Sequence, residues 1–153
     1  MDRDLKWHNR FLDMCRHIAT WSKDRSTKTG CVLVKDRKVL SVGYNGFTPG
    51  IDDEKPYYHD RPQKYWYTEH CDRNAIYSAA RNGIALEGAT MYLTGPPCCD
   101  CARGVVMSGL SLVVWPKNNP FENPGEVQER WRESVAASLE ILEAGGVQIL
   151  RVE

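Results

Sequence analysis

Three residues of this sequence combine the ligand types and the spacing of a zinc site. Cys98 and Cys101 are separated by two residues in a proline-flanked cysteine cluster, and His70 lies upstream of them. Thiolate sulfur and imidazole nitrogen are ligands that Zn²⁺ favours in tetrahedral sites. Three protein ligands leave one position of the tetrahedron open, as in catalytic sites, whereas a structural site is closed by a fourth ligand. Cys71 and Cys99 are the candidates for such a fourth ligand.

A carboxylate accompanies these ligands. Zinc lowers the pKa of bound water towards about 7, and hydrolytic deamination needs a carboxylate that carries the proton to a ring nitrogen and to the leaving ammonia. A glutamate two residues after the histidine suits this role, and Asp72 occupies that position here. Aspartate is one methylene shorter, and displacing a catalytic group by about 1 Å can cost on the order of 10²-fold in rate. We predict Asp72 as the catalytic residue and leave its efficiency open.

Hydrophobic periodicity predicts the elements that position these residues. Helical spacing of apolar residues predicts helices over residues 4–20, 70–82, 98–107 and 126–144. Short apolar runs rich in β-branched residues predict strands over residues 31–34, 39–42, 91–94, 112–115 and 147–150. The metal ligands then fall in the first turns of two helices, where free amides stabilise thiolates. The last helix carries an apolar stripe that we assign to the core: Val127, Trp131, Val135, Leu139 and Leu142.

This order of elements predicts the fold class. Strands that alternate with helices after an initial hairpin indicate an α/β protein with a mixed five-stranded sheet and helices on both faces. The length of 153 residues suits one domain, residues 1–153.

Two segments between the elements attract functional interpretations. Residues 22–30 are dense in hydroxyls and cations and form either a solvated turn or an anion-binding loop. Residues 47–67 are polar, proline-containing and rich in large aromatic residues. Loops longer than about 12–15 residues in compact domains are usually functional or disordered, and the aromatic content argues against disorder. A lid, a partner-binding surface and an effector site remain open.

Composition excludes several classes of partner. Lysine plus arginine and aspartate plus glutamate each number 20, so no global field attracts polynucleotides or anionic membranes. No apolar run has the length of a signal-peptide core or of a membrane span. Six cysteines without a secretion signal argue against a disulfide framework. We therefore expect a cytoplasmic protein, in the host cytoplasm if the chain is encoded by a phage, and disfavour a polynucleotide or tRNA substrate.

Further motifs accompany the zinc residues: Trp21-Ser22-Lys23-Asp24, Gly43-Tyr44-Asn45-Gly46-Phe47, Gly50-Ile51-Asp52-Asp53 and Asn74-Ala75-Ile76. Together with His70-x-Asp72 and Pro97-Cys98-x-x-Cys101, they resemble the zinc-dependent cytidine/deoxycytidylate deaminase superfamily over roughly residues 7–117. The zinc motif is specific to the superfamily. The Gly43–Gly46 segment and the aspartate pair bring the resemblance closest to deoxycytidylate (dCMP) deaminases, including those of phages.

The resemblance implies an α/β/α fold, a hexamer, and conversion of dCMP to dUMP, which feeds dTMP synthesis. It implies that His70, Cys98 and Cys101 hold Zn²⁺ and that Asp72 replaces the proton-shuttling glutamate. Asn45 would contact the deoxyribose, and a further group would lie near the 5′-phosphate: Ser22, Lys23 and Arg25. It also implies a site where dCTP activates and dTTP inhibits, with Mg²⁺ accompanying the effector nucleotide. The residues assigned to that site are Gly43, Tyr44, Gly46, Asp52 and Asp53.

Asp72 leaves two hypotheses from different classes. The first is an active dCMP deaminase, with tolerance of 5-substituted dCMP as a variant of it. The second is a catalytically weak or inactive regulatory protein that binds nucleotides on the same scaffold.

Overall fold

A five-stranded mixed sheet forms the centre of the computed structural model, which describes residues 3–123, 125 and 129–153. The strand order is β2-β1-β5-β6-β7. β1 (Gly30–Lys35) pairs antiparallel with β2 (Lys38–Tyr44) and with β5 (Thr90–Leu93). β5, β6 (Leu112–Pro116) and β7 (Gln148–Val152) run parallel. The prediction of a mixed five-stranded sheet is confirmed.

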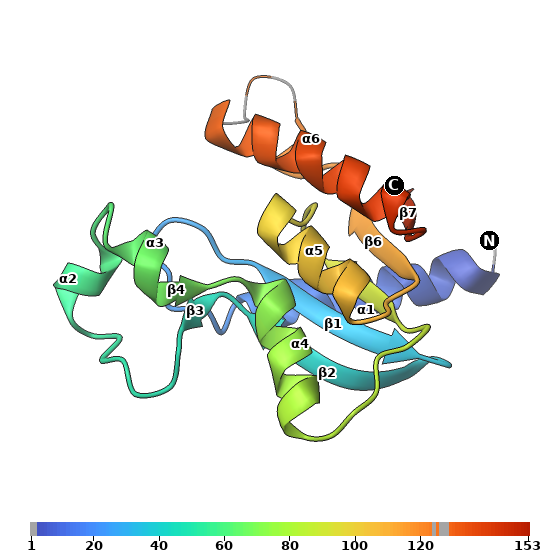
Figure 1. Ribbon diagram of the computed structural model, residues 1–153, viewed down its shortest axis with the longest axis horizontal. Coiled ribbons are helices and arrows are strands. Elements are labelled where there is room, and N and C mark those ends of the chain that lie inside the picture. Colours follow the sequence, from blue (N-terminus) through green and yellow to red (C-terminus); the bar gives the residue numbers. More distant parts are fainter. Residues whose placement is uncertain (1–2, 124, 126–128) are drawn as a thin grey trace.

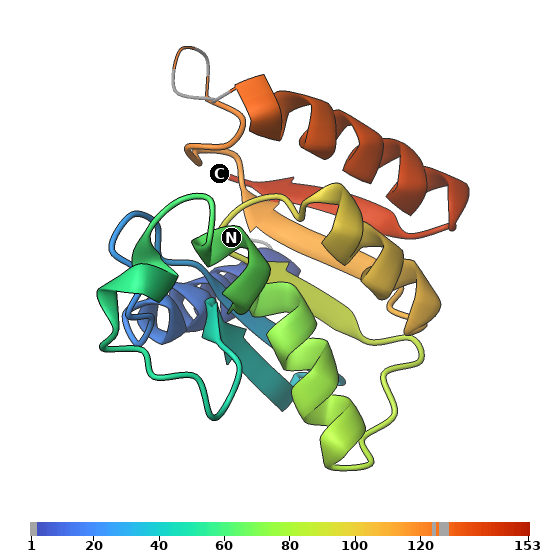
Figure 2. The ribbon, with the colours of Figure 1, turned by 60° about the vertical axis from the view of Figure 1, so that its left-hand side comes forward.

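Helices cover both faces of this sheet (Figures 1 and 2). α1 (Arg3–Ala19) packs on one face, and α4 (Cys71–Arg81), α5 (Cys99–Met107) and α6 (Glu129–Ala144) pack on the other. The alternation along β1 serves both layers, because Cys31 and Leu33 join the core under α4 and α5 while Val32 and Val34 join the core under α1. The predicted α/β/α layering is confirmed. None of the helices in the described ranges is both long and apolar enough to cross a bilayer.

The predicted element bounds agree with the structure within two residues, except in two places. The beginning of the last predicted helix, residues 126–128 with Val127, lies outside the described residues, and α6 begins at Glu129. The segment 47–67, predicted as one loop, contains α2 (Pro56–His59) and α3 (Lys64–Tyr67). It is closed at its base by pairing of β3 (Gly46–Phe47) with β4 (Thr68–Glu69). Elements of two to four residues carry no hydrophobic period, so sequence patterns do not reveal them.

Two glycines let strands contact helix backbones directly. A Cβ atom on Gly30 would lie 2.1 Å from the carbonyl oxygen of Cys15 in α1, and one on Gly43 would lie 2.2 Å from that of Cys71 in α4. Just beyond Gly43, the Asn74 side chain donates a hydrogen bond to the carbonyl of Tyr44 at 2.7 Å. This close approach brings the end of β2 against the first turn of α4, where His70 lies.

Candidate metal centre and nucleotide cavity

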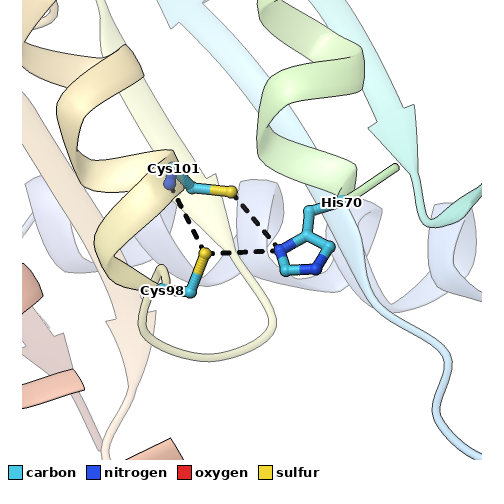
Figure 3. Close-up of side chains that lie close together, drawn as sticks. All are labelled: His70, Cys98 and Cys101. Atoms are coloured by element: carbon cyan, nitrogen blue, oxygen red, sulfur yellow. Dashed lines mark hydrogen bonds between the residues drawn. The ribbon is translucent and has the colours of Figure 1, made fainter. Parts of the chain in front are cut away.

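The metal centre forms where two helices begin side by side (Figure 3). His70 is the N-cap residue of α4 and Cys98 that of α5, and Cys101 lies in the first turn of α5. The Nδ1 atom of His70 is 3.4 Å from Cys98 Sγ and 3.5 Å from Cys101 Sγ. Zn–S bonds of about 2.3 Å and Zn–N bonds of about 2.1 Å at tetrahedral angles separate such atoms by roughly 3.6 Å. The three side chains therefore fit one zinc ion, with Nδ1 as the histidine ligand.

Within the described part of the chain, this metal-ligand cluster has three members. Cys71 belongs to the hydrophobic core beneath α4 and is 5% exposed. The backbone amide of Cys99 donates to the hydroxyl of Ser134 at 3.0 Å, which fixes the turn between the two cysteine ligands. Neither cysteine joins the cluster, so the arrangement matches the open, catalytic type of zinc site rather than the closed structural type.

The cluster favours a thiolate. Hydrogen bonds from Cys101 and His70 outweigh burial and lower the pKa of Cys98 to about 4. The same hydrogen bond to Cys98, followed by burial, raises the pKa of Cys101. The hydrogen bond to Cys98 also raises the pKa of His70. Protons shared in this way are those that a bound metal ion displaces, since zinc takes thiolates and neutral imidazole.

Asp72 lies in the first turn of α4 and is 3% exposed. Burial raises the pKa of its carboxyl group, although the nearby charge of His70 and a hydrogen bond with Cys101 oppose that shift. Its Oδ1 atom accepts from the amide of Arg73 at 3.3 Å. A buried carboxyl group with a raised pKa beside a metal centre suits general acid–base work.

An ion pair that sequence reasoning missed links the two ligand-bearing turns. Arg73 donates to Glu69 Oε1 at 2.7 Å, and the same oxygen accepts the amide hydrogen of His70 at 2.9 Å. On its other side, the Arg73 guanidinium lies 4.0 Å from Asp100 in the first turn of α5. The Glu69 carboxylate is therefore engaged with the Arg73 side chain and with the backbone amide of His70. The i, i+4 spacing of Glu69 and Arg73 is the signal that could have identified the pair.

A cavity of about 820 Å³ opens over the metal centre. His70, Asp72 and Cys98 contribute to its lining, together with two chemically different groups of side chains. The polar group carries hydroxyls and cations: Ser26, Thr27, Arg61, Lys64 and Tyr65. The apolar group comes from the proline-rich loop and α6: Pro120, Phe121, Trp131 and Val135.

Asn45, which the resemblance assigns to the deoxyribose, belongs to the lining of this cavity. Its Oδ1 atom accepts from the Thr29 amide at 2.9 Å and its Nδ2 atom donates to the Thr27 carbonyl at 2.8 Å. Asn45 therefore also holds the loop 22–29 in place. The Oδ1 and Nδ2 atoms of this side chain each retain one hydrogen-bonding position, because an amide oxygen accepts twice and an amide nitrogen donates twice.

The three residues predicted near the phosphate lie outside this lining. Ser22 is 2% exposed, and its hydroxyl donates to the Asn45 carbonyl at 2.8 Å, so it supports the loop from within. Lys23 pairs with Asp53 at 3.0 Å in a different cavity. Arg25 is exposed. The residues of the same loop that reach the large cavity are Ser26 and Thr27, which the sequence did not distinguish from their neighbours.

The second cavity, of about 100 Å³, lies beside the first. Three of the five residues predicted for an effector site line it: Tyr44, Gly46 and Asp53. The two others do not, because Gly43 packs against α4 and Asp52 accepts from the amide of Glu54 at 3.1 Å. Both cavities share the partly buried ion pair of Lys64 with Asp24, in which the charged atoms are 3.1 Å apart.

The assignment of Trp131 to the core was wrong. Trp131 lines the large cavity, and its ring centroid lies 6.2 Å from that of His70. The stripe of α6 is core only further along, as at Leu142, which is fully buried. Phe121 is a second cavity residue that the sequence did not reveal, because a lone aromatic residue in a loop carries no pattern.

Comparisons with known proteins agree with a zinc-binding site at His70, Cys98 and Cys101. Residues 5–117 match the model of the cytidine and deoxycytidylate deaminase zinc-binding region. An uncharacterized deaminase in the luxG 3′ region of Aliivibrio fischeri is 35% identical over 144 residues, which cover 94% of this chain and 92% of that protein. A probable deoxycytidylate deaminase of Caenorhabditis elegans is 38% identical over 119 residues, which cover 75% of this chain and 59% of that protein.

The fold has a solved counterpart. The dCMP deaminase of cyanophage S-TIM5, in complex with dCMP and dUMP, superposes with a TM-score of 0.73 at 19% identity over 99% of both chains. The family model covers most of the chain and includes all three metal-ligand candidates. As the sequence predicted, this chain belongs to the cytidine and deoxycytidylate deaminase family and is an enzyme of the deaminase class.

Proposed function

We propose that this protein catalyses the zinc-dependent hydrolytic deamination of dCMP to dUMP, which supplies dTMP synthesis. The observation that carries the proposal is the tetrahedral spacing of the His70, Cys98 and Cys101 ligand atoms in a cavity lined by the buried carboxyl of Asp72. The cavity volume of about 820 Å³ lies within the range of roughly 300–1,000 Å³ for small-molecule sites. The relative named a probable deoxycytidylate deaminase, and the complex with dCMP and dUMP, favour this nucleotide.

In the proposed reaction, His70, Cys98 and Cys101 would hold the zinc ion, and a water molecule at its open position would be nucleophilic at neutral pH. Asp72 would accept a proton from that water and deliver it to the ring nitrogen, and would then carry the proton of the added hydroxyl group to the leaving amino group. Water thus adds to the carbon that bears the amino group, the bond from that carbon to the amino nitrogen breaks, and ammonia leaves. Burial raises the pKa of Asp72, which makes its carboxylate a stronger base than an exposed aspartate and brings its pKa closer to neutral pH, where one group can serve as base and then as acid.

The polar residues that line the cavity form the proposed phosphate site. They take the role that the resemblance assigned to Ser22, Lys23 and Arg25. Arg61 donates to the Tyr65 hydroxyl at 2.7 Å and lies 3.4 Å from the Ser26 hydroxyl. In these contacts its guanidinium meets neutral oxygens, so its charge remains available to an anion. A guanidinium with adjacent hydroxyls suits a phosphate monoester. The remaining hydrogen-bonding positions of Asn45 suit a deoxyribose hydroxyl.

The smaller cavity is the proposed effector site for dCTP and dTTP, with Mg²⁺ accompanying the nucleotide. Lys23, Asp53 and the exposed rings of Trp21 and Tyr44 supply a cation, a carboxylate and stacking surfaces there. A volume of about 100 Å³ takes only part of a nucleotide, so the rest would lie across the surface. We further propose that residues 1–153 act as a single catalytic domain and assemble as a hexamer.

The test is a panel of substrates with the zinc content measured in the same preparation. We expect about one zinc per chain and ammonia release from dCMP, with 5-methyl-dCMP, dCTP and deoxycytidine as comparison substrates. Protein with a full complement of zinc that releases no ammonia from any of the four would contradict the proposal.

The second candidate function, a regulatory nucleotide-binding protein, is favoured by one observation, the aspartate at position 72. Asp72→Glu separates the two. A similar or lower rate in the variant supports an active site built around aspartate. A large gain in rate would show that the native residue limits catalysis and would favour the regulatory role.

A further inference from the structure

We propose that Phe121 and Trp131 form an aromatic wall that contacts the pyrimidine ring and limits the size of the base that the cavity accepts. We also infer that a hydrogen-bonded network centred on Asn119 and Glu122 fixes the position of this wall. The inference rests on the proposed function for the identity of the ligand, and it adds residues to which that function assigns no role.

The first observation is a chain of three rings that leads from the metal centre into the cavity. The rings of Phe121 and Trp131 meet edge to face, with centroids 5.9 Å apart and an interplanar angle of 82°. The ring of Trp131 in turn lies beside that of His70, with centroids 6.2 Å apart. Phe121, Trp131 and His70 all line the large cavity. Aromatic rings arranged in this way present faces and edges that a planar base contacts favourably.

The second observation is the close fit of Phe121 on a glycine. A Cβ atom on Gly95 would lie 2.7 Å from Phe121 Cδ2 and 3.1 Å from Cε2. Gly95 follows β5, precedes the zinc-ligand turn and lines the same cavity. The absence of a side chain at Gly95 therefore lets the phenyl ring lie directly on the backbone that leads to Cys98.

The third observation is the set of hydrogen bonds that holds the residues on both sides of Phe121. Oδ1 of Asn119, a residue that is 2% exposed, accepts from the amide of Phe121 at 3.0 Å and from the amide of Glu122 at 3.1 Å. Glu122 Oε2 accepts from the Trp115 indole at 2.7 Å and from the Asn119 amide group at 2.9 Å. Glu122 Oε1 accepts from Arg151 at 2.8 Å.

This network anchors the loop to the ends of the sheet. Trp115 belongs to β6 and is fully buried, and Arg151 belongs to β7. The loop that carries Phe121 therefore has a defined position relative to the sheet. A preorganised contact surface limits ligand size more effectively than a mobile one, because it does not yield to a larger ring.

The fourth observation separates the wall from the phosphate end of the cavity. The apolar residues come from residues 120–135, whereas Arg61, Lys64 and Tyr65 come from α3 and the turn before it. The apolar group also borders His70, so the reacting ring rather than the phosphate belongs beside it. Phe121 and Trp131 lie beyond residue 117, where the match to the family model ends. Base selection in this chain is thus assigned to a segment outside the shared zinc-binding region.

The test uses zinc-loaded protein and two equilibrium probes, dUMP and dGMP, measured by calorimetry. Phe121→Ala removes the ring and should weaken dUMP binding roughly tenfold. It should also lower the ratio of the dissociation constants of dGMP and dUMP, because the larger base gains room. Gly95→Ala displaces the ring without removing it and should weaken dUMP binding in the same direction. Tyr77→Ala is the matched control, because Tyr77 is an exposed aromatic residue of α4 that lines neither of the two cavities.

If Phe121 had a purely structural role, Phe121→Ala would weaken the binding of both nucleotides equally and leave the ratio of their dissociation constants unchanged. That result would overturn the proposal of an aromatic wall. So does an unchanged dissociation constant for dUMP in Phe121→Ala with full zinc content. Wild-type protein that binds dUMP but does not deaminate dCMP overturns the proposed reaction alone, and the two variants still decide the wall.

Discussion

The guanidinium of Arg73 lies 2.7 Å from Glu69 Oε1, the oxygen that also accepts the backbone amide of the metal ligand His70. This pair ties the backbone of His70 to α4, and Arg73 also faces Asp100 between the two cysteine ligands. Groups that orient metal ligands in this way commonly affect metal affinity as strongly as some ligands do.

The first prediction concerns Arg73. We expect Arg73→Gln to weaken zinc binding about 10- to 100-fold, because the turns at His70 and Asp100 lose their shared cation. Competition with a chromogenic chelator measures the change. Arg103→Gln serves as the control. Arg103 is exposed, and among the described residues Asp100 is the one carboxylate with which it forms an ion pair. Equal zinc affinity in the two variants would exclude this role for Arg73.

The second prediction concerns Asp72. Asp72→Asn keeps the size of the side chain but cannot carry a proton, so turnover of dCMP should fall by at least about 10²-fold. Zinc content and the dissociation constant for dUMP should stay within a factor of about three, because the group is not a metal ligand in this geometry. Loss of zinc together with activity would instead indicate that Asp72 supports the metal site.

The third prediction concerns pH and the partly buried ion pair of Asp24 and Lys64. Burial opposes ionisation of Asp24, but amide hydrogen bonds from Thr27 and Ser26 and the Lys64 ammonium outweigh it and lower its pKa. A carboxyl group whose folded-state pKa is depressed stabilises the fold fully above its unfolded-state value of about 3.9 and loses that contribution as pH falls through the folded-state value.

Asp24→Asn should therefore lower the free energy of unfolding at pH 7 by about 1–3 kcal/mol, and this difference should shrink below about pH 4. Urea denaturation across this pH range measures it. Asp13→Asn disrupts an exposed pair with Arg16 and should change the free energy of unfolding by less than about 1 kcal/mol. A difference for Asp24→Asn that grows at acid pH would contradict the sign of the shift.

The fourth prediction separates two glycines of one motif. Gly43→Ala should lower the free energy of unfolding by about 1–3 kcal/mol, because the added Cβ would overlap the Cys71 carbonyl oxygen. The melting temperature should fall accordingly. Gly46→Ala should be tolerated far better, since the nearest atom to its added Cβ lies 4.0 Å away. Thermal melts of both variants check this. Equal melting temperatures would mean that β2 and α4 separate at little cost.

The sequence by itself determined the features that depend on local geometry. Cys98 and Cys101 share the first turn of one helix because they are three residues apart, and His70 precedes a helix whose apolar period is clear. The five strands and the mixed parallel and antiparallel character of their sheet followed from runs of β-branched residues and from connection rules. These signals are carried by neighbours in the chain, so the pattern suffices to recognise them.

Only the tertiary structure decided which side chains meet around the ligands. Ser22 and Ser26 belong to the same hydroxyl-rich loop, yet the fold buries the first beneath Asn45 and turns the second into the cavity. Trp131 fits the apolar period of α6, but α6 is placed so that this ring faces His70. Periodicity distinguishes an apolar face from a polar one, but it does not distinguish a core from a cavity wall, because both are apolar. That distinction depends on how distant elements pack.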